Sequence, residues 1–207
     1  MDYIYEIECS LPPTLCERMI ELFELDDRKQ PGITMKDLSS PEEKSEKKHK
    51  ISTDLHLSRF TESHEWGNVD KVLKCKLTEG LKKYLEHLEN HCKSKSIEWE
   101  SSLRDNFRLM IDSGYQIQRT TKGGYYNWHH DMFQTNERTI TFIWYLNTLD
   151  PNVDGGTTDF ECGKSIVPKQ GKLVFFPATW TYLHRGSPVL SDNTKYICTG
   201  WIHENNI

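Results

Sequence analysis

The sequence predicts an α+β fold in which helices come first and buttress a double-sheet jelly roll of β-strands. Before about residue 103, apolar residues recur every three or four positions, which is typical of amphipathic helices. After that point, short apolar runs are separated by Gly, Asn, Asp or Pro, which indicates the short strands of a barrel or sandwich. Helices followed by strands indicate a single α+β arrangement.

One domain accounts for the length of the chain. Its 207 residues allow one sizeable core but are few for two enzymatic domains. We therefore expect a single domain over residues 1–207, with a helical and lid-forming part at 1–102 and the jelly-roll core at 103–207. No internal repeat or interdomain linker interrupts this division.

The first helix is expected to begin at Pro12-Pro13. Thr14 could cap it, and Glu17 three residues later would complete a capping box. Apolar residues at helical spacing follow, and the helix is expected to end near Asp26-Asp27.

A longer helix is expected over residues 68–91, the longest run of helical periodicity. Between the two helices, residues 28–50 are polar and contain Pro and Gly, which predicts a loop or a poorly ordered lid. Residues 51–57 alternate in the manner of a strand. The later runs expected to form strands are residues 107–111, 115–120, 139–146, 172–176 and 196–202.

The composition is that of a globular protein with a polar surface, 36% hydrophobic and 28% charged. A net charge of −5 gives no overall basic field, which argues against a nucleic-acid partner. Basic clusters around residues 44–50 and 71–83 are interleaved with acidic residues, as on a solvated surface. No run approaches the ~20 apolar residues that span a bilayer, so no membrane partner is expected.

The cysteines and the N-terminus predict the compartment. Six scattered cysteines without a Cys-x-x-Cys pair are expected to be reduced thiols rather than a disulfide frame or zinc site. The first residues are acidic and lack the pattern of a secretory signal. We therefore expect a cytoplasmic protein, in the host cytoplasm if the source is a virus.

The pair His129-x-Asp131, followed 53 positions later by His184, is the strongest chemical signal. Side chains at i and i+2 of a strand point to one face, so His129 and Asp131 can reach one metal ion. Two histidines and one carboxylate leave the opposite side of the ion open, a ligand set that favours ferrous iron in oxygenases. Taken singly, His129 could be an ordinary polar residue on the surface, and His184 could be a hydrogen-bonded histidine in the core.

Lys195 lies eleven positions after His184. A buried cation beside such an iron can hold the far carboxylate of a 2-oxoacid, because an unpaired buried charge is expensive. The alternative is a surface lysine that follows the polar residues 191–194. The three ligands and Lys195 together predict an Fe(II)/2-oxoglutarate oxygenase.

Six elements around these residues follow one another in the order found in a known enzyme family. They are Tyr126-Asn127-Trp128-His129-His130-Asp131, residues 139–147, residues 155–160 (Gly-Gly-Thr-Thr-Asp-Phe), residues 171–177, His184 with Pro188-Val189, and Lys195-Tyr196 closing with Thr199 and Trp201. Over roughly residues 105–204 the sequence resembles the prolyl 4-hydroxylase branch of the Fe(II)/2-oxoglutarate dioxygenases. The resemblance implies a double-stranded β-helix, which is a cupin-like jelly roll.

The resemblance also implies the metal and its cosubstrates. His129, Asp131 and His184 would hold Fe(II), with 2-oxoglutarate and O2 as cosubstrates. Ascorbate (vitamin C) is a further cofactor expected on the same ground. No catalytic side chain beyond the metal centre is expected, because the metal and cosubstrate carry the hard chemistry.

Five residues are implied to surround the cosubstrate. Lys195 would bind the C5 carboxylate of 2-oxoglutarate, and the Tyr145 hydroxyl would donate to the same group. Thr199 and Trp201 would line the pocket, and Tyr126 would lie near the metal. Ordinary core packing is the alternative for Tyr145 and Trp201.

The implied reaction is hydroxylation of a prolyl residue in a peptide or protein, with release of succinate and CO2. Arg138 matches an arginine that contacts the peptide in related enzymes, and residues 28–50 could fold over it. The alternatives are hydroxylation of another residue or of a free amino acid, or a non-catalytic metal-binding jelly-roll module. The expected partner is a proline-containing peptide or protein, and the expected state is a monomer or homodimer.

Overall fold

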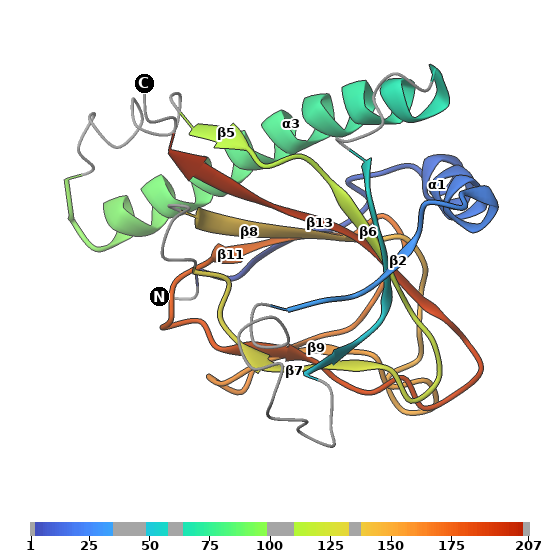
Figure 1. The fold of residues 1–207 in the computed structure, drawn as a ribbon. Coiled ribbons are helices and arrows are strands. Elements are labelled where there is room, and N and C mark those ends of the chain that lie inside the picture. The colour runs from blue at the N-terminus through green and yellow to red at the C-terminus, as the bar shows by residue number, and fades with distance from the viewer. Residues whose placement is uncertain (1–2, 35–48, 58–63, 99–109, 133–137, 205–207) are drawn as a thin grey trace.

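The fold has three layers, with two helices, a large β-sheet and a small β-sheet (Figure 1). The structure is a computed structural model, and it describes residues 3–34, 49–57, 64–98, 110–132 and 138–204. The helices are α1 (Pro13–Leu25) and α3 (His64–Ser94), and both lie on the outer side of the large sheet (Figure 1). Among the described residues, no helix combines the length and apolar character needed to cross a membrane.

The large sheet has eight strands within the described part of the chain, and all its pairings are antiparallel. In spatial order they are β1 (Tyr5–Ile7), β11 (Leu173–Pro177), β8 (Arg138–Tyr145), β13 (Lys195–Glu204), β6 (Gln116–Thr120), β4 (Thr53–His56) and β2 (Gln30–Pro31), with β5 (Met110–Asp112) paired to β13 off this path.

The small sheet has five described strands and is also antiparallel. In order they are β10 (Ser165–Ile166), β9 (Thr158–Phe160), β12 (His184–Gly186), β7 (Tyr125–His129) and β3 (Lys50–Ile51). It lies on the side of the large sheet opposite the helices (Figure 1). The predicted α+β jelly roll with buttressing helices is therefore confirmed.

Helix α1 begins where the prolines predict, but its cap differs from the prediction. Pro12 is the N-cap residue in extended conformation, Pro13 occupies the first turn, and no side chain caps the helix. The predicted capping box of Thr14 and Glu17 is therefore wrong. The fixed φ of proline suits the first helical position, so Pro13 starts the helix one residue before Thr14 could cap it.

Helix α3 extends beyond the predicted 68–91 at both ends. Leu73 and Tyr84 bury one of its faces against the large sheet, where the Tyr84 ring stacks on Phe175 at 5.5 Å between centroids. Gly80 allows this close approach, because a Cβ there would lie 2.7 Å from the side chain of Leu173. The helical periodicity therefore predicted most of the buried face, whereas Val72, which the periodicity also places on it, is 40% exposed.

The single strand predicted over residues 51–57 is two strands in different sheets. β3 pairs with β7 of the small sheet, whereas β4 pairs with β6 of the large sheet. The chain thus crosses between the sheets at Ser52. In the predicted lid at 28–50, residues 30–31 form β2 instead of loop, because they pair with β4. Residues 35–48 lie outside the described part of the chain.

Alternation along β8 divides its side chains between two cores. Phe142 and Trp144 pack with the helices, whereas Ile143 and Tyr145 pack between the two sheets. Period-two alternation of a strand produces this division. Thr141 lies on the same side as Ile143 and faces the space between the sheets, where the site forms.

Candidate active site

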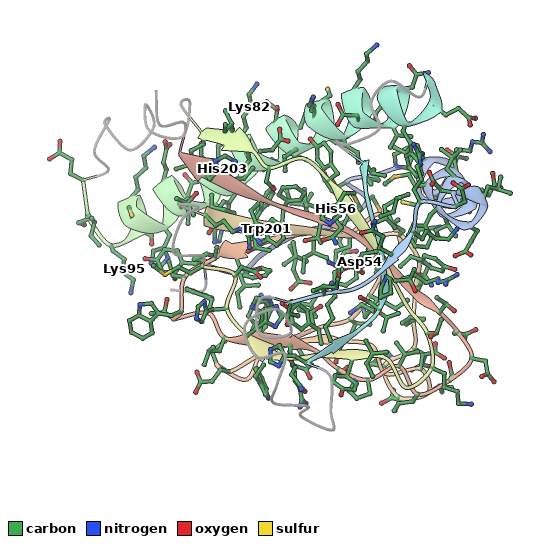
Figure 2. The ribbon with its side chains drawn as sticks, in the orientation of Figure 1. Asp54, His56, Lys82, Lys95, Trp201 and His203 are labelled. Atoms are coloured by element: carbon green, nitrogen blue, oxygen red, sulfur yellow. The ribbon has the colours of Figure 1, made fainter. Side chains whose placement is uncertain are left out.

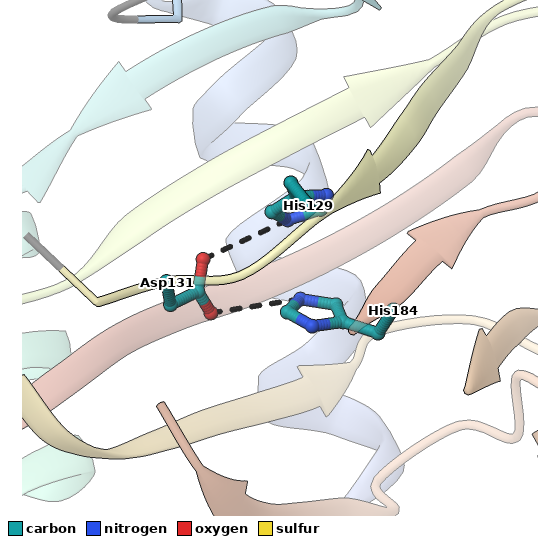
Figure 3. A group of neighbouring side chains, drawn as sticks. All are labelled: His129, Asp131 and His184. Carbon is teal, nitrogen blue, oxygen red and sulfur yellow. Dashed lines mark ion pairs between the residues drawn. The ribbon is translucent and has the colours of Figure 1, made fainter. Parts of the chain in front are cut away.

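The predicted metal ligands meet on the small sheet. His129 ends β7, His184 begins β12, and the two residues pair directly across the antiparallel ladder. Asp131 follows two residues after His129. The Nε2 atoms of His129 and His184 each lie 3.6 Å from a different carboxylate oxygen of Asp131 (Figure 3). One potential ligand atom from each residue lies within 4.8 Å of the others, so a single ion can reach all three.

Both histidines have Nδ1 occupied by a backbone carbonyl. Nδ1 of His129 lies 2.7 Å from the carbonyl oxygen of Asn127, and Nδ1 of His184 lies 3.0 Å from that of Tyr182. An Nδ1–H that donates to a carbonyl leaves the Nε2 lone pair free and fixes the ring orientation. Metal-binding histidines have this second contact, so the three residues fit a metal ion.

The protonation states also suit a metal site. Burial, followed by the nearby His184, lowers the pKa of His129 to about 3, so its imidazole is neutral at pH 7. Burial alone would raise the pKa of Asp131, but the two histidines and the Thr141 hydroxyl outweigh it, and the pKa lies below its ordinary value. Metal ligation requires this combination of a neutral imidazole and an ionised carboxylate.

A β-bulge in β7 places a tyrosine beside the metal ligands. His184 pairs with His129 and Gly186 with Tyr126, so β7 has one residue more than β12 over this stretch. Two residues then separate Tyr126 from His129, yet both side chains line the pocket and their rings stack at 3.5 Å. Trp128 is 42% exposed and is not part of the pocket wall. Bulges of this kind re-aim side chains next to active sites.

Thr141, on β8 of the large sheet, orients the carboxylate of Asp131. Its hydroxyl donates to Oδ2 of Asp131 at 2.7 Å. Sequence reasoning missed this residue, although it stands in the predicted strand 139–146, because a strand pattern does not say which inward side chain meets a ligand. Outer hydrogen bonds of this kind orient metal-binding groups.

Lys195 lines the same pocket as the three candidate metal ligands, and its contact with a cosubstrate stays a prediction. The residue is 5% exposed, no described residue forms a hydrogen bond or ion pair with its ammonium, and its Nζ lies 5.7 Å from the centre of the Tyr145 ring. Burial lowers the pKa of Lys195 to about 8, with a partial offset from Asp159. A buried cation without a counter-charge is costly, so this end of the pocket suits an anion.

Residues 115–203 match the family model of the 2OG-Fe(II) oxygenase superfamily. This part of the chain belongs to that superfamily. These residues therefore form an Fe(II)/2-oxoglutarate-dependent dioxygenase domain, whose superfamily uses Fe(II), 2-oxoglutarate and O2. The cluster His129, Asp131 and His184 lies within the matched residues and is its candidate iron site.

The oxygenase shares its fold with solved prolyl hydroxylase structures. The viral collagen prolyl hydroxylase vCPH from Paramecium bursaria Chlorella virus-1, solved with 2OG, is 22% identical with a TM-score of 0.62 over 99% of this chain and 97% of the viral one. A Pseudomonas putida prolyl-4-hydroxylase is 14% identical with a TM-score of 0.63 over 98% and 93% of the two chains. The fold is thus the double-stranded β-helix that these structures share.

A third solved structure is a prolyl hydroxylase from Trichoplax adhaerens in complex with a peptide fragment of the hypoxia inducible factor oxygen degradation domain. It is 14% identical, with a TM-score of 0.66 over 99% of this chain and 84% of the other. No curated protein matches the chain.

Thr158 lies between Tyr145 and the pocket that holds the candidate metal ligands. The Tyr145 hydroxyl donates to the Thr158 hydroxyl at 2.7 Å, and Thr158 lines the pocket whereas Tyr145 does not. Sequence reasoning chose Tyr145 and missed Thr158, although Thr158 stands in the Gly-Gly-Thr-Thr-Asp-Phe element. Gly155 and Gly156 precede it with φ of +65° and +69°, a left-handed conformation that favours glycine.

The predicted cosubstrate residues Thr199 and Trp201 lie on β13 of the large sheet, where Figure 2 labels Trp201. Thr199 and Trp201 both line the pocket of the oxygenase, and the Thr199 hydroxyl donates to the carbonyl of Phe142 at 2.7 Å. Arg138 stacks its guanidinium over the Trp201 ring at 3.5 Å and donates to the Asp131 carbonyl at 3.2 Å. These contacts join Arg138 to the metal site, and its contact with a peptide stays a prediction.

Proposed function

We propose that this oxygenase hydroxylates prolyl residues in a peptide or protein and releases succinate and CO2. The observation that carries the proposal is the buried Lys195, which shares one pocket with His129, Asp131 and His184. This combination suits a metal-bound 2-oxoacid with a second carboxylate. The likeness of the fold to three prolyl hydroxylases supports a prolyl substrate.

The proposed site uses both sheets of one domain over residues 1–207. When bound, Fe(II) and 2-oxoglutarate would supply the electrons that activate O2, which is the oxidant and the source of the oxygen atom inserted into a C–H bond. His129, Asp131 and His184 would hold the metal, and Thr141 would keep the carboxylate in place. The residues of the chain thus bind and orient the reactants, and none needs to act as a nucleophile or general base.

The cosubstrate would be held at its far end by Lys195. Its ammonium would pair with the C5 carboxylate, and the hydroxyl of Thr158 would donate to the same group while accepting from Tyr145. Thr199 and Trp201 would form the wall beside it, and Tyr126 the wall near the metal. The pocket would place the reactants between the two sheets, where a bound cosubstrate would displace water and strengthen each charge interaction.

Succinate formation and peptide mass test the proposal together. The full chain is incubated with Fe(II), 2-oxoglutarate, O2 and a proline-rich peptide, and a peptide with alanine at each proline serves as the control. We expect succinate and a peptide mass gain of one oxygen atom with the proline-rich peptide alone. His129→Ala should abolish both, whereas His130→Ala, an exposed neighbour, should retain both.

Other outcomes separate the alternatives. Succinate that forms only with a different peptide or with a free amino acid would contradict the prolyl substrate and leave the cosubstrate site standing. A protein that binds Fe(II) but never produces succinate would instead be a non-catalytic metal-binding module.

A further inference from the structure

A buried ion pair lies beside the site, outside the residues that match the family model. Nζ of Lys50 donates to Oδ2 of Asp54 at 2.7 Å, and both residues are 5% exposed. Lys50 belongs to β3 of the small sheet, and Asp54, labelled in Figure 2, belongs to β4 of the large sheet. The pair therefore joins the two sheets where the chain crosses between them.

Neighbouring polar groups hold the carboxylate of this pair. Oδ1 of Asp54 accepts from the Ser52 hydroxyl at 2.7 Å, and Oδ2 accepts from the Gln116 amide at 2.9 Å. The Gln118 amide in turn donates to Gln116 at 3.0 Å. With three donors on one carboxylate, Asp54 is fixed, and it fixes the ammonium of Lys50.

Lys50 reaches the metal ligands through an aromatic ring. It pairs with Tyr126 across the β3–β7 ladder, lines the pocket, and places Nζ 5.2 Å from the centre of the Tyr126 ring. The Tyr126 ring stacks on the His129 imidazole with 13° between the planes. Asp54, Lys50, Tyr126 and His129 thus form one continuous series of contacts.

Stability alone is a weak reason for such a pair. A buried ion pair often contributes little to folding, because desolvation of the two charges offsets their attraction. A cation over an aromatic face, in contrast, restrains the ring that it covers. The restraint falls on Tyr126, and through it on the plane of a candidate iron ligand.

We propose that Lys50 is a positioning residue for the metal centre and that Asp54 holds it in place. The ammonium keeps the Tyr126 ring against His129, so that Nε2 of this histidine is oriented before the metal arrives. The inference rests on the proposed function only in so far as His129 binds the metal. It assigns a role in the site to a segment that precedes the family domain.

The test is an anaerobic Co(II) titration of the full chain, followed by visible absorption. Lys50→Met/Asp54→Asn removes both charges and keeps one oxygen that can accept from Ser52 or from Gln116. We expect Co(II) affinity about tenfold weaker than wild type, at the lower end of outer-contact effects on metal sites, with a changed Co(II) spectrum. Lys50→Arg keeps the cation and should restore the wild-type spectrum.

Two further variants test whether the effect on Co(II) binding passes through the Tyr126 ring. Tyr126→Leu removes the ring, and in that background Lys50→Met/Asp54→Asn should cause no further loss, because the two changes act through one contact. Lys172→Met is the matched control: this buried lysine pairs with Glu6 at 2.8 Å outside the pocket, so its loss should leave Co(II) affinity unchanged.

The proposal is overturned if the double variant keeps the wild-type Co(II) affinity and spectrum. It is also overturned if the double substitution lowers Co(II) affinity in the Tyr126→Leu background as much as it does in the wild type. Should the double variant not fold, Lys50→Gln replaces it, since it removes the charge and keeps a donor to Asp54, with the same two outcomes. Wild-type protein that binds Co(II) no better than His129→Ala would instead contradict the proposed metal centre.

Discussion

At the scale of single residues, the buried ammonium of Lys195 is the group that we propose binds the far carboxylate of the cosubstrate. Its pKa of about 8 lies below the ordinary 10.5, so burial disfavours its charged form in the ligand-free protein. Below pH 8 the charged Lys195 therefore lowers the free energy of unfolding of the ligand-free protein. This destabilisation is relieved as the pH rises from about 8 to 10.5, where the folded chain loses the proton first. A carboxylate beside the ammonium would remove the same cost.

The pH dependence of cosubstrate binding follows from this pKa. Binding of 2-oxoglutarate to the protonated lysine should weaken above pH 8, to about tenfold weaker at pH 9 than at pH 7. Anaerobic calorimetry of the Mn(II)-loaded protein measures it. The control is 2-oxopentanoate, which lacks the far carboxylate. Its affinity should not fall tenfold between pH 7 and pH 9. Equal pH profiles for the two acids would contradict the role of Lys195.

Substitution of Lys195 should have opposite effects on binding and folding. Lys195→Met should weaken 2-oxoglutarate binding by ~3–5 kcal/mol, or roughly two to three decades. The same change should stabilise the ligand-free fold by on the order of 1–3 kcal/mol, because it removes an uncompensated buried charge. Urea unfolding measures the second effect.

Lys172→Met is the control for that measurement, because its ammonium is paired with Glu6 and Glu8. Its loss should lower the free energy of unfolding. A Lys195→Met variant that is also destabilised would show that Lys195 has a partner in the fold.

Among the elements, β7 contributes most to the site. Its extra residue lets Tyr126 and His129 face the pocket together, and the Asn127 carbonyl within the bulge accepts from His129. A strand pattern can predict that His129 and Asp131 share a face, but it cannot predict a bulge, because the extra residue exists only relative to β12.

Deletion of Asn127 should therefore weaken metal binding strongly while the overall fold is retained. It removes the extra residue and the carbonyl, and a one-residue shift moves side chains to the other face. We expect Co(II) affinity to fall by roughly 100-fold with the circular dichroism spectrum retained. Asn127→Ala keeps the backbone and should bind Co(II) as wild type does. Wild-type affinity in the deletion variant would mean that the bulge is dispensable.

A local sequence pattern does not show which strands pair with one another, and this decides which parts of the fold and site were predictable. Helical periodicity gave α1 and α3, and the His-x-Asp spacing gave the ligands that the structure brings together. The crossing of residues 50–56 between sheets was not predictable, because β3 and β4 are distinguished by their partners rather than by their own pattern. Thr141 and Thr158 act across strands, so no local spacing singles them out.

At the scale of the whole molecule, the site joins the two sheets. His129 and His184 come from the small sheet, whereas Thr141 and Lys195 come from the large one. A metal and a dicarboxylate bound between them would contact both, so binding should stabilise the fold as a unit.

Thermal unfolding tests this linkage. With metal and 2-oxoglutarate each at about 100 times its dissociation constant, each ligand contributes ~2.7 kcal/mol, and the combined gain of ~5.4 kcal/mol should raise Tm by roughly 11–22 °C. Scanning calorimetry with Mn(II) under anaerobic conditions measures it. His130→Ala should show the same rise and His129→Ala little of it. An equal rise in His129→Ala would place the metal elsewhere.

The most direct measurement is a crystal structure of the anaerobic complex with Fe(II) and 2-oxoglutarate. We predict one metal ion held by His129, Asp131 and His184, with the C5 carboxylate of 2-oxoglutarate on the ammonium of Lys195. A metal ion held by other residues, or a cosubstrate whose far carboxylate lies away from Lys195, would contradict the account.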